Sequence, residues 1–124
     1  SLFNTVCRAM AALDHPLPLM IQALPNAKVF ADIAQQWKIA LIQEAFADRA
    51  YQQSGHLVPR SANNAVFHHS DQVLAQTKNL MAKQQVISID DQPVNIAAET
   101  LCVHGDTPSA MKWIKLLRQY LDAS

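Results

Sequence analysis

Short apolar runs alternate with amphipathic segments of helical period through most of this chain, and that alternation limits the folds open to it. Residues 19–23 predict a short strand, and residues 39–42 form a near-continuous apolar run. Such a run suits a strand that is covered on both faces, as in a parallel sheet. Between the two runs, Asn26 can cap a helix whose apolar face would be Val29, Phe30, Ile33, Ala34 and Trp37. The order strand–helix–strand is typical of α/β folds.

The alternation resumes after a long polar segment, residues 43–69. A helix is predicted from residue 70, a hairpin from residues 86–89 and 94–96, and a last buried strand at residues 101–103. The inner side of the helix from residue 70 would hold Val73, Leu74, Thr77, Leu80 and Met81. Thr107 and Pro108 mark a final helix with the inner stripe Ala110, Ile114, Leu117 and Leu121. We expect an α/β layer or barrel piece, with its chemistry where parallel strands end.

Composition narrows the class of protein further. The 124 residues suit a single unit, residues 1–124, and the hydrophobic half of them can bury a sizeable core. Ten Lys and Arg balance ten Asp and Glu, so the basic excess of a nucleic-acid or anionic-membrane binder is missing. No apolar run approaches the ~20 residues that span a bilayer. Cys7 and Cys102 stand far apart, which favours a reduced, cytoplasmic setting.

Ionisable side chains gather after the apolar run at residues 39–42. Glu44 and Asp48 supply carboxylates suited to general-base work. Arg49 and Arg60 supply planar donors suited to a carboxylate or phosphate oxygen. Tyr51 can reach a ligand from the same segment, or it can anchor the loop. The alternative is an Arg–Asp ion pair that only holds a long loop in shape, and spacing alone favours neither.

A second polar group stands where the last predicted strand ends. His104 titrates near neutral pH and can transfer a proton, and Gly105 allows a sharp turn. Asp106 can orient that histidine or act as a base, but spacing alone favours a plainer role at the start of the final helix. We predict no metal site at His68 and His69, because adjacent residues on a strand point to opposite faces.

Three segments carry a resemblance to a known family. They read Glu-Ala-Phe-Ala-Asp-Arg-Ala-Tyr at residues 44–51, Gly55 followed by Leu-Val-Pro-Arg at residues 57–60, and Thr-Leu-Cys-Val-His-Gly-Asp at residues 100–106. In order and approximate spacing they resemble signatures of the LamB/YcsF family. Residues 1–4 resemble the stretch after that family's Pro-His-Gly motif. The chain departs from the family pattern at Ser54, Asn63, Asn64, Gln92 and Glu99, positions that bear on loop geometry.

The resemblance implies a fold, and it implies that this chain supplies only part of that fold. Members of that family are about twice this length, and their fold is an irregular (β/α) barrel of the glycoside hydrolase/deacetylase type. This chain would be the C-terminal half of such a domain. Because half a barrel exposes strand edges and apolar surface, we expect it to need the N-terminal half or a second copy of itself.

The resemblance also implies an activity. Family membership suggests the A subunit of an ATP-dependent 5-oxoprolinase, which opens 5-oxo-L-proline to L-glutamate together with subunits B and C. Arg49 and Arg60 would hold the substrate carboxylate or a phosphate. A carboxylate (Glu44, Asp48 or Asp106) would activate water, and His104 would pass a proton to the ring nitrogen. ATP would be used by the assembled complex, and no metal is predicted from this half.

Two other functions are open at this point. One is a metal-dependent, deacetylase-like amide hydrolase, whose metal ligands would have to lie in the other half. The second is a non-catalytic module that serves in binding or assembly.

Overall fold

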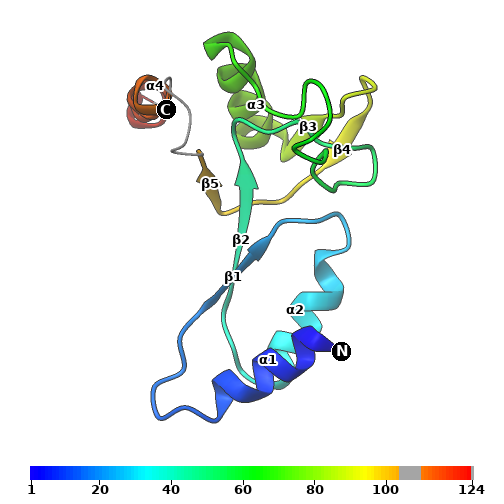
Figure 1. The fold of residues 1–124 in the computed structure, drawn as a ribbon. Coiled ribbons are helices and arrows are strands. Elements are labelled where there is room, and N and C mark those ends of the chain that lie inside the picture. The colour runs from blue at the N-terminus through cyan, green and yellow to red at the C-terminus, as the bar shows by residue number, and fades with distance from the viewer. Residues whose placement is uncertain (104–109, 124) are drawn as a thin grey trace.

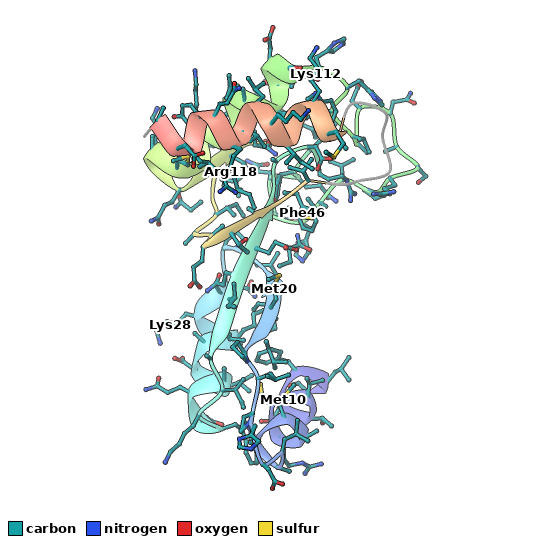
Figure 2. All side chains as sticks on the ribbon, turned by 90° about the vertical axis from the view of Figure 1, so that its left-hand side faces the viewer. Met10, Met20, Lys28, Phe46, Lys112 and Arg118 are labelled. Atoms are coloured by element: carbon teal, nitrogen blue, oxygen red, sulfur yellow. The ribbon has the colours of Figure 1, made fainter. Side chains whose placement is uncertain are left out.

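The computed structural model of the protein describes residues 1–103 and 110–123. The elements within these ranges are α1 (Leu2–Ala11), β1 (Leu19–Gln22), α2 (Ala27–Gln36), β2 (Leu41–Phe46), α3 (Ser70–Lys83), β3 (Gln85–Ile87), β4 (Pro93–Asn95), β5 (Thr100–Cys102) and α4 (Ala110–Ala123). Figure 1 shows α1 and α2 at one end, α3, α4 and the β3–β4 hairpin at the other, and β2 running between them. Met20 lies at the narrow middle of this elongated arrangement (Figure 2).

The main sheet is parallel, with the strand order β1-β2-β5. β1 pairs with the first part of β2, from Leu19 opposite Leu41, and β5 pairs with its last part, as far as Cys102 opposite Phe46. The predicted α/β class with a parallel sheet is therefore confirmed. Closure of the sheet into a barrel stays a prediction, because these three strands form an open sheet within the described residues.

The two faces of this sheet differ in what covers them. Leu19, Ala45 and Leu101 belong to hydrophobic clusters that include residues of the helices or the hairpin. Side chains alternate along a strand, so Met20 and Phe46 lie on the opposite face. Neither joins a hydrophobic cluster of the described residues, and Met20 is 55% exposed. Within the part of the chain that the structure describes, β2 thus has one well-covered face, where its apolar run predicts two.

Most predicted helices and strands are confirmed, with shifts in their boundaries and faces. The strands at 19–23 and 101–103, the helix from residue 70 and the hairpin all form. Helix α1 was not predicted; Ser1 Oγ caps it by accepting from the Asn4 amide. Asn26 precedes α2 as expected, although its side chain makes no capping hydrogen bond. Thr107 and Pro108 lie outside the described residues.

Three apolar faces were predicted imperfectly. On α4, Trp113 is buried (1% exposed), whereas Ile114 and Leu121 are 43% and 38% exposed, because the helix packs against α3 and Ala47 through its Trp113 side. Val29 on α2 and Met81 on α3 are also exposed. No helix within the described ranges has the length and apolar character needed to cross a membrane.

The polar segment after residue 42 is the largest correction to the expected elements. Residues 43–46 continue β2, because β5 supplies hydrogen-bonding partners there. The chain then doubles back, with the Ala50 amide donating to the Ala65 carbonyl at 2.9 Å and the Phe67 amide to the Asp48 carbonyl at 2.8 Å. Gly55 turns at φ +89° against Pro25, where a Cβ would come within 2.2 Å of Pro25 Cδ. This folded-back loop, residues 47–67, presents the candidate site.

Candidate functional site

The carboxyl ends of β2 and β5 lie side by side. The Ala47 amide donates to the Cys102 carbonyl at 3.0 Å, so the chain leaves both strands at neighbouring points. Loops that follow the carboxyl ends of parallel strands are where α/β proteins usually place their chemistry. Asp48 and Arg49 follow β2 at this edge, as the sequence predicted. Val103 is the last described residue on the β5 side, and His104 and Asp106 lie outside the described residues.

Arg49 places a permanent charge in an almost closed environment. The residue is 7% exposed, and its Nη2 donates to the Val58 carbonyl at 2.9 Å. Its Nε is buried without a hydrogen-bond partner, and no ion pair joins Arg49 to an acidic side chain within residues 1–103 and 110–123. The expected alternative, an Arg–Asp pair that holds the loop, is not seen for Arg49 in that range. A buried guanidinium with an unmet donor is well suited to an anionic ligand oxygen.

Asp48 is fully buried beside Arg49 in the chain. Its backbone is fixed on both sides, because its carbonyl accepts from Phe67 and the neighbouring Ala47 amide is bound to β5. The backbone that carries this carboxylate is thus held by the sheet as well as by its loop. A carboxylate fixed in this way is a candidate base or electrostatic group.

Gln76 of α3 fixes the turn from the other side, and sequence analysis missed it. The side chain is buried, and its Nε2 donates to the carbonyls of Phe46 at 2.7 Å and Arg49 at 2.9 Å. One signal was present in the sequence: position 76 falls on the same helix face as the predicted core residues Val73 and Leu80. A glutamine on an apolar face needs a partner, and here the partners are the site's own carbonyls.

Tyr51 anchors this region. It is fully buried, and its hydroxyl oxygen accepts from the Phe46 amide at 3.0 Å. Burial, with a smaller contribution from the negative charge of Glu44, raises the pKa of Tyr51 to about 12, against the opposing effects of the Phe46 hydrogen bond and the Arg49 charge. The anchoring role that the sequence left open is therefore the one that the geometry supports; contact with a ligand stays a prediction.

Glu44 and Cys102 complete the described group. In the sheet register Glu44 lies opposite Thr100, two residues before Cys102. Burial raises the pKa of the Cys102 thiol, and the negative charges of Glu44 and Asp48 raise it further. In the sheet Cys102 lies opposite Phe46, two residues along β2 from Glu44. Cys102 was not among the candidate residues, because its role depends on the β2–β5 register, which sequence spacing does not reveal.

The remaining candidates among the described residues lie at the surface. Arg60 is exposed and lines a depression of about 400 Å³ whose walls include none of the residues Glu44, Asp48, Arg49 and Tyr51. Those four residues also line none of the other four depressions described on the surface. His68 and His69 are exposed. The described ranges contain no group of three or more His, Cys, Asp or Glu side chains placed to hold a metal ion.

Comparison with known proteins identifies the family of this chain. The model of the LamB/YcsF family matches residues 1–124. The chain belongs to the LamB/YcsF family. The family membership that the three sequence segments suggested is thereby confirmed.

Similar members of the LamB/YcsF family carry consistent names. The chain is 40% identical over 122 residues to the A subunit of the 5-oxoprolinase of Vibrio cholerae serotype O1, covering 98% of this chain and 49% of the relative. It is 39% identical over 119 residues to the second 5-oxoprolinase A subunit of Pseudomonas putida, with shares of 96% and 46%. The chain thus spans about half the length of these relatives.

A solved structure agrees with the fold. The lactam utilization protein from Thermus thermophilus superposes with a TM-score of 0.76 at 26% sequence identity. The match covers 98% of this chain and 47% of that protein. The mixed α/β arrangement with its parallel sheet is therefore shared with that lactam utilization protein.

Proposed function

We propose that this chain contributes the C-terminal half of the A subunit of a 5-oxoprolinase, an enzyme that opens the lactam ring of 5-oxo-L-proline to give L-glutamate. The names of its relatives support the reaction. The observation that carries the proposal is the buried Arg49, with its unmet Nε, next to the buried Asp48 at the end of β2. Subunits B and C, and the other half of the A subunit, would complete the enzyme.

Recognition of the substrate falls to Arg49 in this proposal. The substrate 5-oxoproline carries a carboxylate, and a planar guanidinium can donate two parallel hydrogen bonds to such a group. Because Arg49 is nearly closed off from water, an anion placed there would be attracted far more strongly than at the surface. Arg60, which is exposed, would serve a phosphate or carboxylate nearer the surface.

Ring opening needs a base and an acid. Asp48, or Glu44 on β2, would take a proton from a water molecule as the oxygen of that water bonds to the lactam carbonyl carbon. The carbon–nitrogen bond of the ring then breaks, and His104 would protonate the departing nitrogen, with Asp106 orienting that histidine. The product is the open-chain amino acid with a new carboxylate.

ATP belongs to the assembled complex as a second substrate that drives the ring opening. The chain has two glycines, Gly55 and Gly105, which stand far apart in the sequence, so it contains no glycine-rich phosphate loop. We assign the contacts with the phosphate groups of ATP to Arg49 or Arg60 together with the partner subunits. A cytoplasmic setting fits the free cysteines Cys7 and Cys102.

The test is ATP-dependent glutamate release from 5-oxoproline by the assembled enzyme carrying Asp48→Asn. We expect a loss of about 10²–10⁴-fold in rate, because the amide cannot act as a base. Asp71→Asn, an exposed position at the start of α3, is the matched control and should retain full activity. Wild-type rates from the Asp48→Asn enzyme would remove Asp48 from the mechanism.

A non-catalytic assembly role is the second candidate, favoured by exposed apolar side chains such as Met20 and Ile114, which are 55% and 43% exposed. If the chain restores no activity when combined with the other half and both partner subunits, this role replaces the catalytic one. Within the described residues, no observation favours the metal-dependent amide hydrolase.

A further inference from the structure

Three polar side chains form a row across the parallel sheet, on the face that carries Met20 and Phe46. Gln22 of β1 lies opposite Glu44 of β2 in the register, and Glu44 lies opposite Thr100 of β5. Register partners in a parallel sheet point to the same side, and neighbouring strands are about 4.8 Å apart. A carboxamide, a carboxylate and a hydroxyl therefore stand side by side. Along the strands this row lies between Met20 and Phe46 (Figure 2).

Gln22 carries an unmet hydrogen-bond donor in this row. Its Nε2 is buried and has no hydrogen-bond partner within the described residues, although the residue as a whole is only half-buried. A buried amide nitrogen without an acceptor costs free energy, so such a group calls for a partner. Gln22 is also the last residue of β1, and ligands of α/β proteins bind at the carboxyl ends of parallel strands. Both observations favour a ligand as the missing acceptor.

We propose that Gln22 hydrogen-bonds the ring amide of a lactam and thereby selects a cyclic substrate. The amide of a five-membered lactam is held cis by the ring, so its N–H and its C=O lie on one edge. A side-chain carboxamide presents the complementary edge: Nε2 donates to the lactam oxygen, and Oε1 accepts from the lactam N–H. An open-chain amide is trans and turns its N–H and C=O to opposite edges, so it can make only one of these two hydrogen bonds.

The surroundings of Gln22 suit this role. The terminal torsion of a glutamine is soft, so the carboxamide of this half-buried residue can turn its edge toward the open face of the sheet. Glu44, one of the two candidate bases, is its neighbour in the register and would lie beside the amide bond that opens. The inference rests on the proposed function and deepens it by naming the residue that recognises the lactam ring.

The experiment measures the binding of two ligands to the assembled enzyme by calorimetry, without ATP. One ligand is 5-oxoproline, and the other is its lactone analogue, in which a ring oxygen replaces the N–H. We expect the wild type to bind the lactam at least tenfold more tightly, because the lactone has no hydrogen to donate to Oε1. Gln22→Met should lower the affinity for the lactam roughly 10–100-fold and abolish the preference over the lactone.

Stability separates this role from a structural one. Gln22→Met replaces an unmet buried amide with an apolar side chain of similar length, so the melting temperature should not fall. Gln43→Met is the matched control: Gln43 Oε1 is also buried without a partner, but this side chain lies on the opposite, covered face of β2. The Gln43→Met enzyme should bind both ligands as the wild type does.

Three results would overturn the inference: the wild type binds no 5-oxoproline, it binds lactam and lactone equally, or Gln22→Met keeps the wild-type preference. Gln22→Asn withdraws the carboxamide by one methylene, so it should show the same loss, and it decides the matter if Gln22→Met does not fold. Because binding is measured without turnover, failure of the proposed function is separable. Lactam-selective binding through Gln22 without glutamate release refutes the reaction alone, and glutamate release with a preference that ignores Gln22 refutes the inference alone.

Discussion

Asp48 and Arg49 are adjacent ionisable residues, and both are buried just after the end of β2. Spacing after an apolar run was enough to single out both. It was not enough to reveal that Arg49 would be closed off from water with its Nε unmet, since that depends on the fold of residues 47–67. Gln76 and Cys102 belong to α3 and β5, and the sequence did not single out either of them as a site residue.

Arg49→Lys tests whether the guanidinium recognises an anion. Lysine keeps the charge but loses the planar donor pair, so a hydrogen bond to a charged group worth about 1.5–3 kcal/mol is lost. We expect kcat/KM for 5-oxoproline in the assembled enzyme to fall roughly 10–100-fold. Arg8→Lys, on the exposed surface of α1, should leave it unchanged. An unaltered kcat/KM in Arg49→Lys would contradict a recognition role.

Tyr51→Phe tests the anchor through pH. The folded pKa of about 12 lies above the ordinary value near 10, so the unfolded chain gives up its proton first and stability falls as pH rises from about 10 to about 12. This contribution is complete below pH 10 and shrinks by about 1 kcal/mol at pH 11. The variant should be less stable by about 1–3 kcal/mol at pH 9, because the Phe46 amide loses its acceptor.

Urea unfolding at pH 9 and pH 11 measures this effect. The gap in unfolding free energy between wild type and Tyr51→Phe should narrow at the higher pH, because the variant has no phenol to titrate. A gap that stays constant or widens would show that the Tyr51 hydroxyl is not buried as described.

At the scale of elements, the local sequence pattern located the helices and strands, whereas pairing between distant segments set their boundaries. Periodicity identified α2, α3, the hairpin and β5, since each carries its own apolar face. It ended β2 too early because the partner of residues 44–46 is β5, far along the chain. On α4 it placed Ala110 and Leu117 correctly but misjudged Ile114 and Leu121, because no local pattern encodes the position of α3, against which this helix packs.

Gln76→Leu tests the link between α3 and the site. The change leaves the carbonyls of Phe46 and Arg49 without their donor in a buried setting, so we expect a loss of about 2–4 kcal/mol in unfolding free energy. Gln72→Leu, on an exposed face of the same helix, should change stability by less than about 0.5 kcal/mol. Equal melting curves for the two variants would mean that α3 does not hold the turn.

At the scale of the whole molecule, the sequence predicted the class of fold. The alternation of strands and helices led to a parallel α/β sheet, and resemblance led to a half-length member of its family. The sheet does stay open within the described residues, with one covered face and a groove at the β5 edge.

The central claim is that the loops after β2 and β5 serve one reaction centre. A double-mutant cycle on Asp48 and His104 in the assembled enzyme tests it most directly, with glutamate release as the readout. Residues of one catalytic unit are strongly non-additive, so Asp48→Asn combined with His104→Ala should cost no more than the worse single change. Losses that multiply as for independent sites would contradict the account.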